Sequence, residues 1–293
     1  MNSIKLSNGV LIPTIGFGAA AIGEFKQDNA YLEGVVTDAI NSGYRHIDTA
    51  SLYGNERSIG KAIKKSNIDR HDFFITSKVW DTDQGYKNTL KSFDNSLDRL
   101  GLNYLDLYLI HWPYEEKTKE TWQALERLYE DKRVRAIGVS NFRISDLEDI
   151  KSFAKYMPVV NQVELHPYLT QESVIKYCAQ NNIIVFCWSP LGTGSWSGVE
   201  LAYKPISDDT IRKISEQHGV SPAQVILKWN TQQGRIVIPK SETHANIINN
   251  SQLDNFTLSE GEIREINVLN KSLRFGGDPD NSTASNLQQI VPA

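Results

Sequence analysis

A regular alternation of short apolar runs and longer amphipathic segments is the feature that most limits how this chain can fold. The two runs at 105–109 and 183–187 are nearly continuous in large apolar residues, as is typical of strands covered on both faces. Eight strands interleaved with helices predict a parallel (β/α)₈ TIM barrel, with an open doubly wound sheet as the alternative. The apolar runs are 15–18, 46–50, 73–79, 105–111, 134–140, 159–165, 183–189 and 236–239.

The segments between these runs have the length of helices. They cover 30–42, 55–66, 86–100, 118–131, 143–154, 171–181 and 221–233. Ser221 before Pro222 predicts a capped helix start, and Thr170 before Gln171 and Glu172 predicts another. The alternation of predicted strands and helices is interrupted once, by a Gly/Ser-rich loop at 192–198 and an extra helix near 208–218. Helices near 243–250 and 259–270 then precede a polar tail.

The N-terminal segment and the absence of a linker complete the expected architecture. Asn8-Gly9 between two apolar runs at 4–12 predicts a tight β-hairpin, which we interpret as a cap on the larger body. No linker separates parts of the chain. We therefore expect residues 1–293 to form a single domain, a size that barrels commonly reach.

The composition excludes several classes of function. The 31 basic and 35 acidic side chains give a net charge of −4 without a basic block, which argues against nucleic acid as a partner. No run approaches the ~18 apolar residues of a membrane span, so no membrane partner is expected. Cys178 and Cys187 lie in no metal or disulfide motif, which indicates a reducing, cytoplasmic location.

Polar side chains gather where the predicted strands end, and barrel enzymes place their functional groups at that position. Any one of these residues has an ordinary structural explanation, such as a buried histidine or a solvated lysine. Converging titratable groups are hard to explain by packing, because buried charges are costly unless paired. The residues are Asp48, Tyr53, Lys78, His111, Ser140, Asn141, Gln162, Glu164, His166, Trp188, Ser189, Lys240 and Ser241.

Four of these side chains suggest a proton donor for carbonyl reduction. A phenol is a weak acid at neutral pH, but the ammonium of Lys78 would lower the pKa of Tyr53 toward the working range. Asp48 would keep the lysine charged and oriented, and His111 could hydrogen-bond the carbonyl oxygen.

The remaining polar residues suggest a source of hydride. Ser140, Asn141 and Gln162 suit a carboxamide, and Trp188 offers a flat face for a nicotinamide ring. Lys240 and Ser241 could take a phosphate.

Several stretches of the chain resemble the signatures of the aldo-keto reductase family. They are Gly43–Ala50 through Tyr53–Glu56, Arg135–Phe142 and Ile238–Ser241, with further similarity at Leu105–Pro113, Asn161–Glu164, Trp188–Gly192 and Ser221–Val225. The resemblance implies a (β/α)₈ fold that binds NAD(P)H across the barrel mouth and acts on a small carbonyl substrate. It implies Tyr53 as general acid, Lys78 and Asp48 as tuning residues, and His111 as the substrate-orienting residue. A monomer is a further family-level expectation.

The resemblance also implies a set of cofactor contacts. Ser140, Asn141 and Gln162 would hold the carboxamide, and Trp188 would stack on the nicotinamide where many members use Tyr. The phosphates and the adenosine end would contact Ser189, Leu191, Lys240, Ser241 and Asn250.

One departure from the family pattern concerns the choice of cofactor. Asn246 stands where members commonly carry an arginine that grips the 2′-phosphate of NADPH, and Asn cannot reproduce a bidentate or stacked contact. NADPH is the first prediction because Lys240 is kept, and NADH remains possible.

Two other departures predict an open substrate pocket. Ala19-Ala20-Ala21 replaces a frequent aromatic residue, whose space Phe25 could fill, and only Tyr114–Lys117 separates Pro113 from the next helix. The expected walls are Leu52, Trp80, Trp112, loop 192–200 and tail 272–293. The tail resembles the microbial branch containing 2,5-diketogluconate reductase and prostaglandin F synthase-like enzymes.

Two other functions compete with carbonyl reduction. A metal-dependent barrel hydrolase would use His46, Asp48, His111 and His166, but His46 and His166 lack clear inward partners, so no metal is expected. His46 is interpreted as structural. A non-catalytic barrel that binds cofactor as a sensor is disfavoured, because it would not need the complete set of four polar residues.

Overall fold

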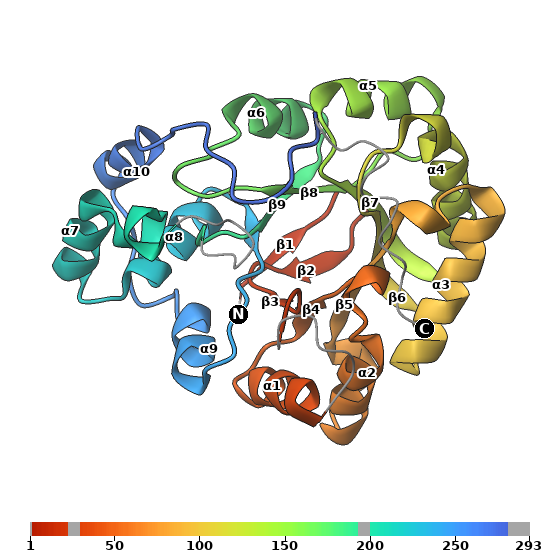
Figure 1. Ribbon diagram of the computed structural model, residues 1–293, viewed down its shortest axis with the longest axis horizontal. Helices are drawn as coiled ribbons and strands as arrows, with labels where there is room; N and C mark the ends of the chain where they lie inside the picture. Colours follow the sequence, from red (N-terminus) through yellow and green to blue (C-terminus); the bar gives the residue numbers. More distant parts are fainter. Residues whose placement is uncertain (1, 23–29, 193–199, 281–293) are drawn as a thin grey trace.

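Eight parallel strands curl into a closed ring in the computed structural model, which describes residues 2–22, 30–192 and 200–280 (Figure 1). The strands neighbour one another in chain order, and a parallel bridge between Ile15 and Val237 joins the first side to the last. The barrel prediction is thereby confirmed over the open sheet. The strands are β3 (Phe17–Gly18), β4 (His46–Asp48), β5 (Phe74–Val79), β6 (Leu105–Ile110), β7 (Val134–Ser140), β8 (Val160–Glu164), β9 (Ile184–Trp188) and β10 (Ile236–Val237).

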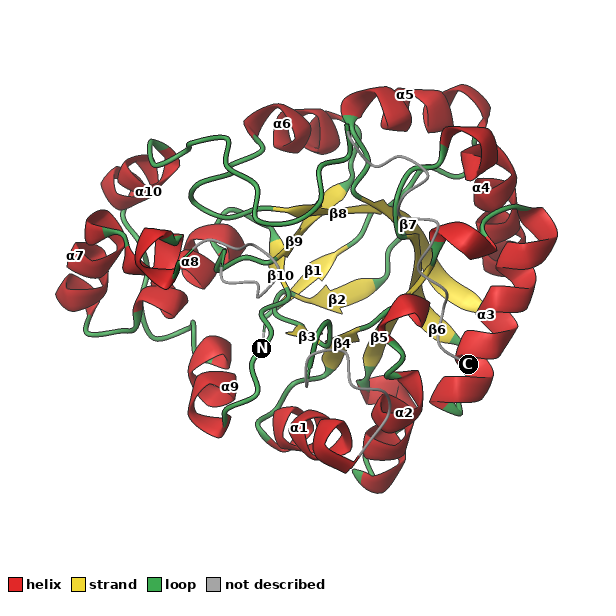
Figure 2. Cartoon of the chain, viewed as in Figure 1, coloured by secondary structure: helices red, strands yellow, loops and turns green. Residues whose placement is uncertain are grey.

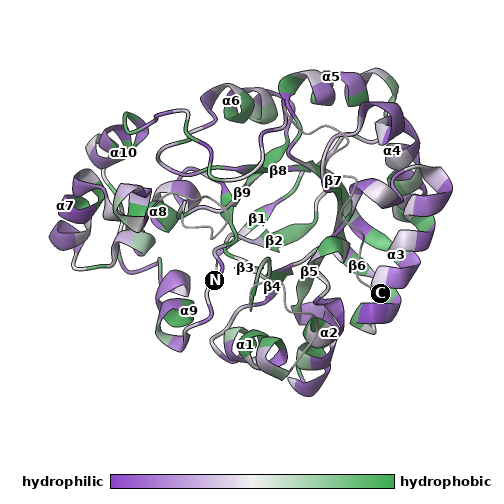
Figure 3. Ribbon diagram, viewed as in Figure 1, coloured by the Kyte–Doolittle hydropathy of each residue, from purple (hydrophilic) through white to green (hydrophobic). Residues whose placement is uncertain are grey.

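Helices surround the ring, with hydrophilic residues on their outer faces and hydrophobic ones concentrated on the strands (Figures 2 and 3). Those in the described residues are α1 (Ala30–Asn41), α2 (Glu56–Lys65), α3 (Tyr86–Leu100), α4 (Glu115–Glu130), α5 (Ile144–Phe153), α6 (Glu172–Gln180), α7 (Asp209–His218), α8 (Pro222–Thr231), α9 (His244–Ser251) and α10 (Glu260–Asn267). None of these helices is both long and apolar enough to cross a membrane.

Two helix starts differ in how well the sequence predicted them. Ser221 caps α8 as expected, because its side chain accepts from the backbone N–H of Gln224 and proline occupies the first turn. The prediction that Thr170 caps α6 is wrong. Gln171 precedes the helix in the left-handed conformation, with φ 53° and no side-chain cap. The short segment after Pro113 is helical from Glu115 onward.

The predicted N-terminal hairpin forms and closes one end of the barrel. β1 (Ser3–Lys5) pairs antiparallel with β2 (Leu11–Pro13). The loop proper spans residues 7–9, because Leu6 N donates to Val10 O at 2.8 Å, and Gly9 takes the positive φ (88°) that a three-residue loop requires.

Leu6 and Ile12 of the hairpin are buried in a cluster with residues from the beginnings of several strands, among them Phe74, Val160 and Ile236. The hairpin therefore covers the N-terminal end of the barrel, and the opposite end remains for chemistry.

Candidate active site

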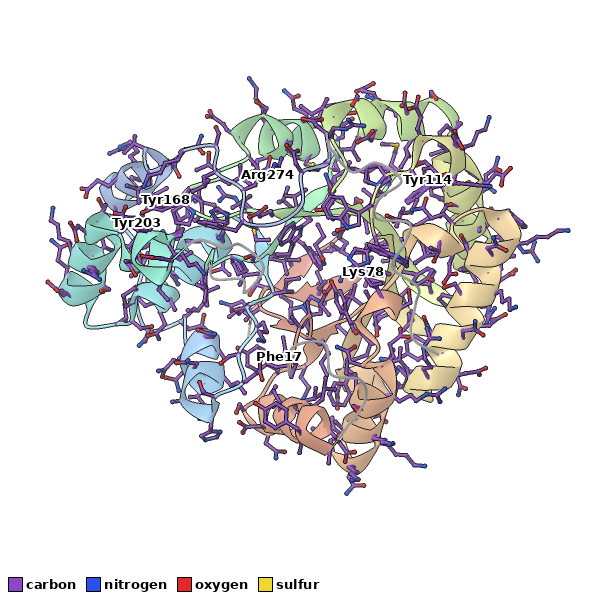
Figure 4. All side chains as sticks on the ribbon, in the orientation of Figure 1. Phe17, Lys78, Tyr114, Tyr168, Tyr203 and Arg274 are labelled. Atoms are coloured by element: carbon purple, nitrogen blue, oxygen red, sulfur yellow. The ribbon has the colours of Figure 1, made fainter. Side chains whose placement is uncertain are left out.

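Four polar side chains meet at the C-terminal end of the barrel, and we call them the mouth quartet: Asp48, Tyr53, Lys78 and His111. Asp48 ends β4, Lys78 lies near the end of β5, and His111 follows β6. A 3₁₀ turn, Ser51–Tyr53, carries Tyr53 back toward the ring. Lys78 lies inside the ring of strands in Figure 4. The structure thus brings together the four residues that the sequence singled out.

Lys78 and Asp48 form a fully desolvated ion pair. The Lys78 ammonium donates to Asp48 Oδ1 at 2.5 Å and to the carbonyl oxygen of Thr49 at 2.9 Å. Gln162 Nε2 donates to the other carboxylate oxygen at 2.8 Å. Burial lowers the pKa of Lys78, but the charge of Asp48 and the nearby Tyr53 raise it more, so its pKa lies above the ordinary value. Lys78 therefore stays a cation at neutral pH.

Tyr53 lies between this ion pair and His111. Its hydroxyl is 3.5 Å from His111 Nε2, and the Lys78 ammonium is 5.1 Å from the centre of its ring. Burial raises the pKa of Tyr53 more than Lys78 lowers it, and Asp48 adds to the rise. The expectation that Lys78 brings this pKa down toward neutrality is wrong for the net shift. The phenol therefore keeps its proton at neutral pH.

His111 is an electrically neutral neighbour of Tyr53. Burial, followed by the charge of Lys78, holds the pKa of His111 well below its ordinary value. Its ring packs edge-on against Trp80, with centroids 5.1 Å apart. Asn141 Nδ2 donates to the backbone oxygen of His111 at 3.0 Å, which fixes the loop after β6. A neutral imidazole can hydrogen-bond an oxygen without adding a charge to the site.

The residues predicted for a carboxamide form one hydrogen-bonded chain beside the quartet. Ser140 Oγ donates to Gln162 O at 2.9 Å and accepts from Asn141 Nδ2 at 3.1 Å. Trp188 Nε1 donates to Asn141 Oδ1 at 2.8 Å, which fixes the plane of the indole. Gln162 ties this chain to Asp48. Fixed amide and hydroxyl groups next to a flat, half-buried indole fit a carboxamide and the aromatic ring that carries it.

A segment after α10, residues 271–280, crosses the mouth, and we call it the C-terminal strap. The fully buried Glu164 accepts from Phe275 N at 2.6 Å and from Gly276 N at 3.2 Å. A Cβ at Gly276 would lie 2.2 Å from Trp188 Cη2, so only glycine fits against the indole there. Figure 1 shows the strap in blue beside β8.

The tail from residue 272 onward was predicted as a pocket wall, but its anchor on Glu164 is the part of the site that sequence reasoning missed. Glu164 stands among the polar residues near the predicted strand ends, and the sequence assigns it no role. The signal that could have found it is the combination of a carboxylate in a buried strand with the pair Gly276-Gly277 in the tail. A Cβ at Gly277 would lie 3.0 Å from Trp112 Cη2, so the strap passes close to both Trp112 and Trp188.

The residues predicted for the phosphate and adenosine end lie on two segments, one that follows β9 and one that runs from β10 to α9. Ser241 Oγ accepts from Thr243 N at 3.3 Å, and Asn250 is buried on α9. Lys240 forms an ion pair with Glu242, a partner that the sequence did not predict. Ser189 and Leu191 follow β9, with Ser189 in the left-handed conformation at φ 47°.

The predicted pocket walls are only partly described. Trp80 is buried against His111, and Leu52 and Trp112 are half-buried. Phe25 lies outside the described residues, as do residues 193–199 of the predicted loop and residues 281–293 of the tail.

The four residues of the competing metal site do not converge. His46 Nε2 lies 3.3 Å from Thr76 Oγ1, and its ring packs between Phe74 and Phe186. Burial lowers the pKa of His46 to about 3, and His166 pairs with Glu164 instead. Across residues 2–22, 30–192 and 200–280, no three His, Cys, Asp or Glu side chains are arranged to hold a metal ion.

Comparison with known proteins gives one consistent result. Residues 14–271 match the model of the Aldo/keto reductase family. The chain is 45% identical over 280 residues to a 9,11-endoperoxide prostaglandin H2 reductase of Trypanosoma cruzi, covering 96% of this chain and 95% of that protein. It is 46% identical over 279 residues to a glyoxal reductase of Bacillus subtilis, covering 95% and 96%.

Solved structures agree with the sequence matches. A deep-sea metagenome aldo-keto reductase superposes with a TM-score of 0.89 at 39% identity, over 96% of this chain and 100% of that one. A Bombyx mori aldo-keto reductase in complex with NADP gives a TM-score of 0.86 at 30% identity, over 95% and 96%.

Proposed function

The chain belongs to the Aldo/keto reductase family, and from this premise we propose that the mouth quartet catalyses reduction of a small aldehyde or ketone to the alcohol. Membership makes the protein an NAD(P)H-dependent oxidoreductase. The observation that carries the catalytic assignment is the Tyr53 hydroxyl, 3.5 Å from the neutral His111 and beside the desolvated Lys78–Asp48 pair.

The proposed reaction divides between the cofactor and the quartet. When bound, the nicotinamide supplies a hydride to the carbonyl carbon. Tyr53 donates its phenolic proton to the carbonyl oxygen as negative charge develops there, which gives the alcohol and a tyrosinate. Lys78 stabilises that tyrosinate, and Asp48 keeps the ammonium in place through the 2.5 Å contact. Solvent then returns the proton to Tyr53.

His111 is proposed to orient the substrate. Its Nε2 faces the same space as the Tyr53 hydroxyl, so both atoms can hydrogen-bond one carbonyl oxygen. Because burial keeps the imidazole neutral, it can orient the oxygen without competing with Tyr53 as the acid.

The cofactor contacts are proposed residue by residue. Ser140, Asn141 and Gln162 would hold the carboxamide through the hydrogen-bonded chain already described, and Trp188 would stack on the nicotinamide ring. Ser189 and Leu191 would follow the phosphates, and the adenosine end would contact Lys240, Ser241 and Asn250. Trp80, Trp112 and Leu52 would line the substrate side.

Substitution of Tyr53 by Phe tests the proposal, because it removes only the hydroxyl. We expect turnover to fall by at least about 10²-fold, the usual contribution of a general acid, while cofactor binding survives. Turnover should be measured on aldehydes, α-dicarbonyls and keto sugars, with NADPH and NADH in separate assays. The α-dicarbonyls belong in the panel because one relative is named a glyoxal reductase.

The matched control is Tyr86→Phe, at the exposed start of α3, which should leave turnover unchanged. Near-full activity of the Tyr53→Phe variant on any carbonyl that the wild type reduces would show that another group is the acid.

A further inference from the structure

Lys240, the residue on which the NADPH prediction depends, already has an anionic partner. Its ammonium pairs with the carboxylate of Glu242, two residues later in the segment between β10 and α9. The hydroxyl of Tyr31, on α1, donates to the same carboxylate at 2.9 Å. The side chains of Lys240 and Glu242 are 40% and 25% exposed, so a ligand arriving from solvent can reach both.

The charges along this segment do not favour a 2′-phosphate. Between positions 240 and 250 the basic residues are Lys240 and His244, and each pairs with a carboxylate. His244 Nδ1 lies 2.6 Å from Asp38 Oδ1. Asn246, exposed on α9, has an uncharged amide. A phosphate monoester carries about two negative charges, and its protein sites normally supply an unopposed cation.

We propose that Glu242 selects the cofactor, so that this reductase prefers NADH to NADPH. The inference rests on the proposed function, in which the adenosine end of the dinucleotide lies along residues 240–250. A carboxylate there accepts a hydrogen bond from the 2′-hydroxyl of the NADH ribose and repels the 2′-phosphate of NADPH. Acidic residues discriminate between the two cofactors by the same physics in other dinucleotide-binding folds.

Tyr31 and Lys240 act on Glu242 as positioning residues. The Tyr31 hydroxyl and the Lys240 ammonium restrain the carboxylate from two sides, so an incoming phosphate cannot simply displace it into solvent. NADPH binding would have to break the contacts of Glu242 with Tyr31 and Lys240. The 2′-phosphate and the Glu242 carboxylate would then compete for the single ammonium of Lys240. NADH binding leaves both contacts in place and adds a hydrogen bond.

Cofactor binding without any carbonyl substrate tests the proposal independently of catalysis. The dissociation constants of NADH and NADPH are measured by quenching of tryptophan fluorescence, for the wild type and for Glu242→Gln. We expect the wild type to bind NADH at least about tenfold more tightly, and the substitution to move the NADPH/NADH ratio toward NADPH by at least about tenfold. Higher salt should weaken NADPH binding to the variant more than NADH binding to the wild type.

Two further variants separate recognition from a general effect of charge. Glu265→Gln removes one exposed carboxylate from α10 and should leave the ratio unchanged. Tyr31→Phe should shift the ratio in the same direction as Glu242→Gln but by less, because it loosens the carboxylate without removing it.

The possible outcomes distinguish the inference from the function beneath it. Equal or tighter binding of NADPH by the wild type, or an unchanged ratio in Glu242→Gln, overturns the inference and leaves the reductase assignment intact. Failure of the wild type to bind either dinucleotide overturns both.

Discussion

Two lysine–carboxylate pairs of the same chemistry lie at opposite ends of the proposed cofactor path. The Lys78–Asp48 pair at the barrel mouth has side chains 0% and 3% exposed, whereas the Lys240–Glu242 pair on the rim has side chains 40% and 25% exposed. The mouth pair is also bound by Thr49 O and by Gln162 Nε2, and the rim carboxylate is bound by the exposed Tyr31.

This difference in burial assigns different tasks to the two pairs. Because solvent barely reaches the two side chains, each member of the mouth pair depends on the other, since an uncompensated buried charge is strongly disfavoured. The mouth pair therefore gives Tyr53 a fixed electrostatic environment. At the rim, solvent reaches both charges, so a ligand can bind Glu242 while Lys240 and Tyr31 keep it in place. A charge shielded from solvent suits catalysis, and a restrained charge that solvent reaches suits selection between ligands.

The largest expected effect comes from breaking the mouth pair. Lys78→Met leaves the Asp48 carboxylate buried without its cation, so we expect the free energy of unfolding to fall by about 3–5 kcal/mol. Urea denaturation followed by tryptophan fluorescence measures the change. Adding Asp48→Asn to Lys78→Met should recover part of the loss, because the stranded charge is then gone. A loss below about 1 kcal/mol in the single variant would show that water already reaches the pair.

The same comparison is sharpened by Asp81, a buried carboxyl that forms no ion pair within the described residues. Asp81 is 7% exposed, and burial raises its pKa to about 7, although a hydrogen bond from Gln84 Nε2 at 3.3 Å opposes the rise. The unfolded chain loses this proton near the ordinary value of 3.8, whereas the folded protein keeps it up to about pH 7. The folded state therefore binds more protons in that interval, and stability falls as pH rises through it, by up to about 4 kcal/mol.

Asp81→Asn should remove that pH dependence. The advantage of the variant over the wild type in free energy of unfolding should grow by about 2–3 kcal/mol as pH rises from about 5 to about 8. Urea denaturation at both pH values measures the difference, with the fully exposed Asp209→Asn as control. If the wild type and Asp81→Asn curves ran parallel between the two pH values, Asp81 would be ionised in the folded protein throughout.

The barrel and the mouth quartet were predictable from sequence because both follow from local periodicity. Apolar runs locate strands, parallel strands share one C-terminal end, and Asp48, Lys78 and His111 each fall at such an end. The helices were located for the same reason. The Thr170 cap was wrong because Gln171 adopts a left-handed conformation that the order of residues does not reveal.

The features that the sequence did not predict depend on burial and on contacts between distant residues, and both arise only in the complete fold. The sign of the Tyr53 pKa shift is a balance between burial and the charge of Lys78, and burial is known only once the mouth is assembled. Glu164 meets the backbone of Phe275, 111 positions away, and Tyr31 meets Glu242, 211 positions away. Neither contact can be recognised from the residues next to it in the sequence. The contact of Glu164 anchors the strap, and the contact of Tyr31 restrains the Glu242 carboxylate.

The smallest expected effect, and the sharpest test of the comparison, is the coupling between Lys240 and Glu242. A double-mutant cycle with Lys240→Met and Glu242→Gln should give a coupling in unfolding free energy of about 0–1 kcal/mol. That coupling should shrink as salt rises from about 0.05 to about 0.5 M, whereas a cycle with Lys78→Met and Asp48→Asn should keep its larger value. A rim coupling above about 2 kcal/mol that resisted salt would make the rim pair as fixed as the mouth pair. The difference in exposure would then not be what distinguishes the two pairs.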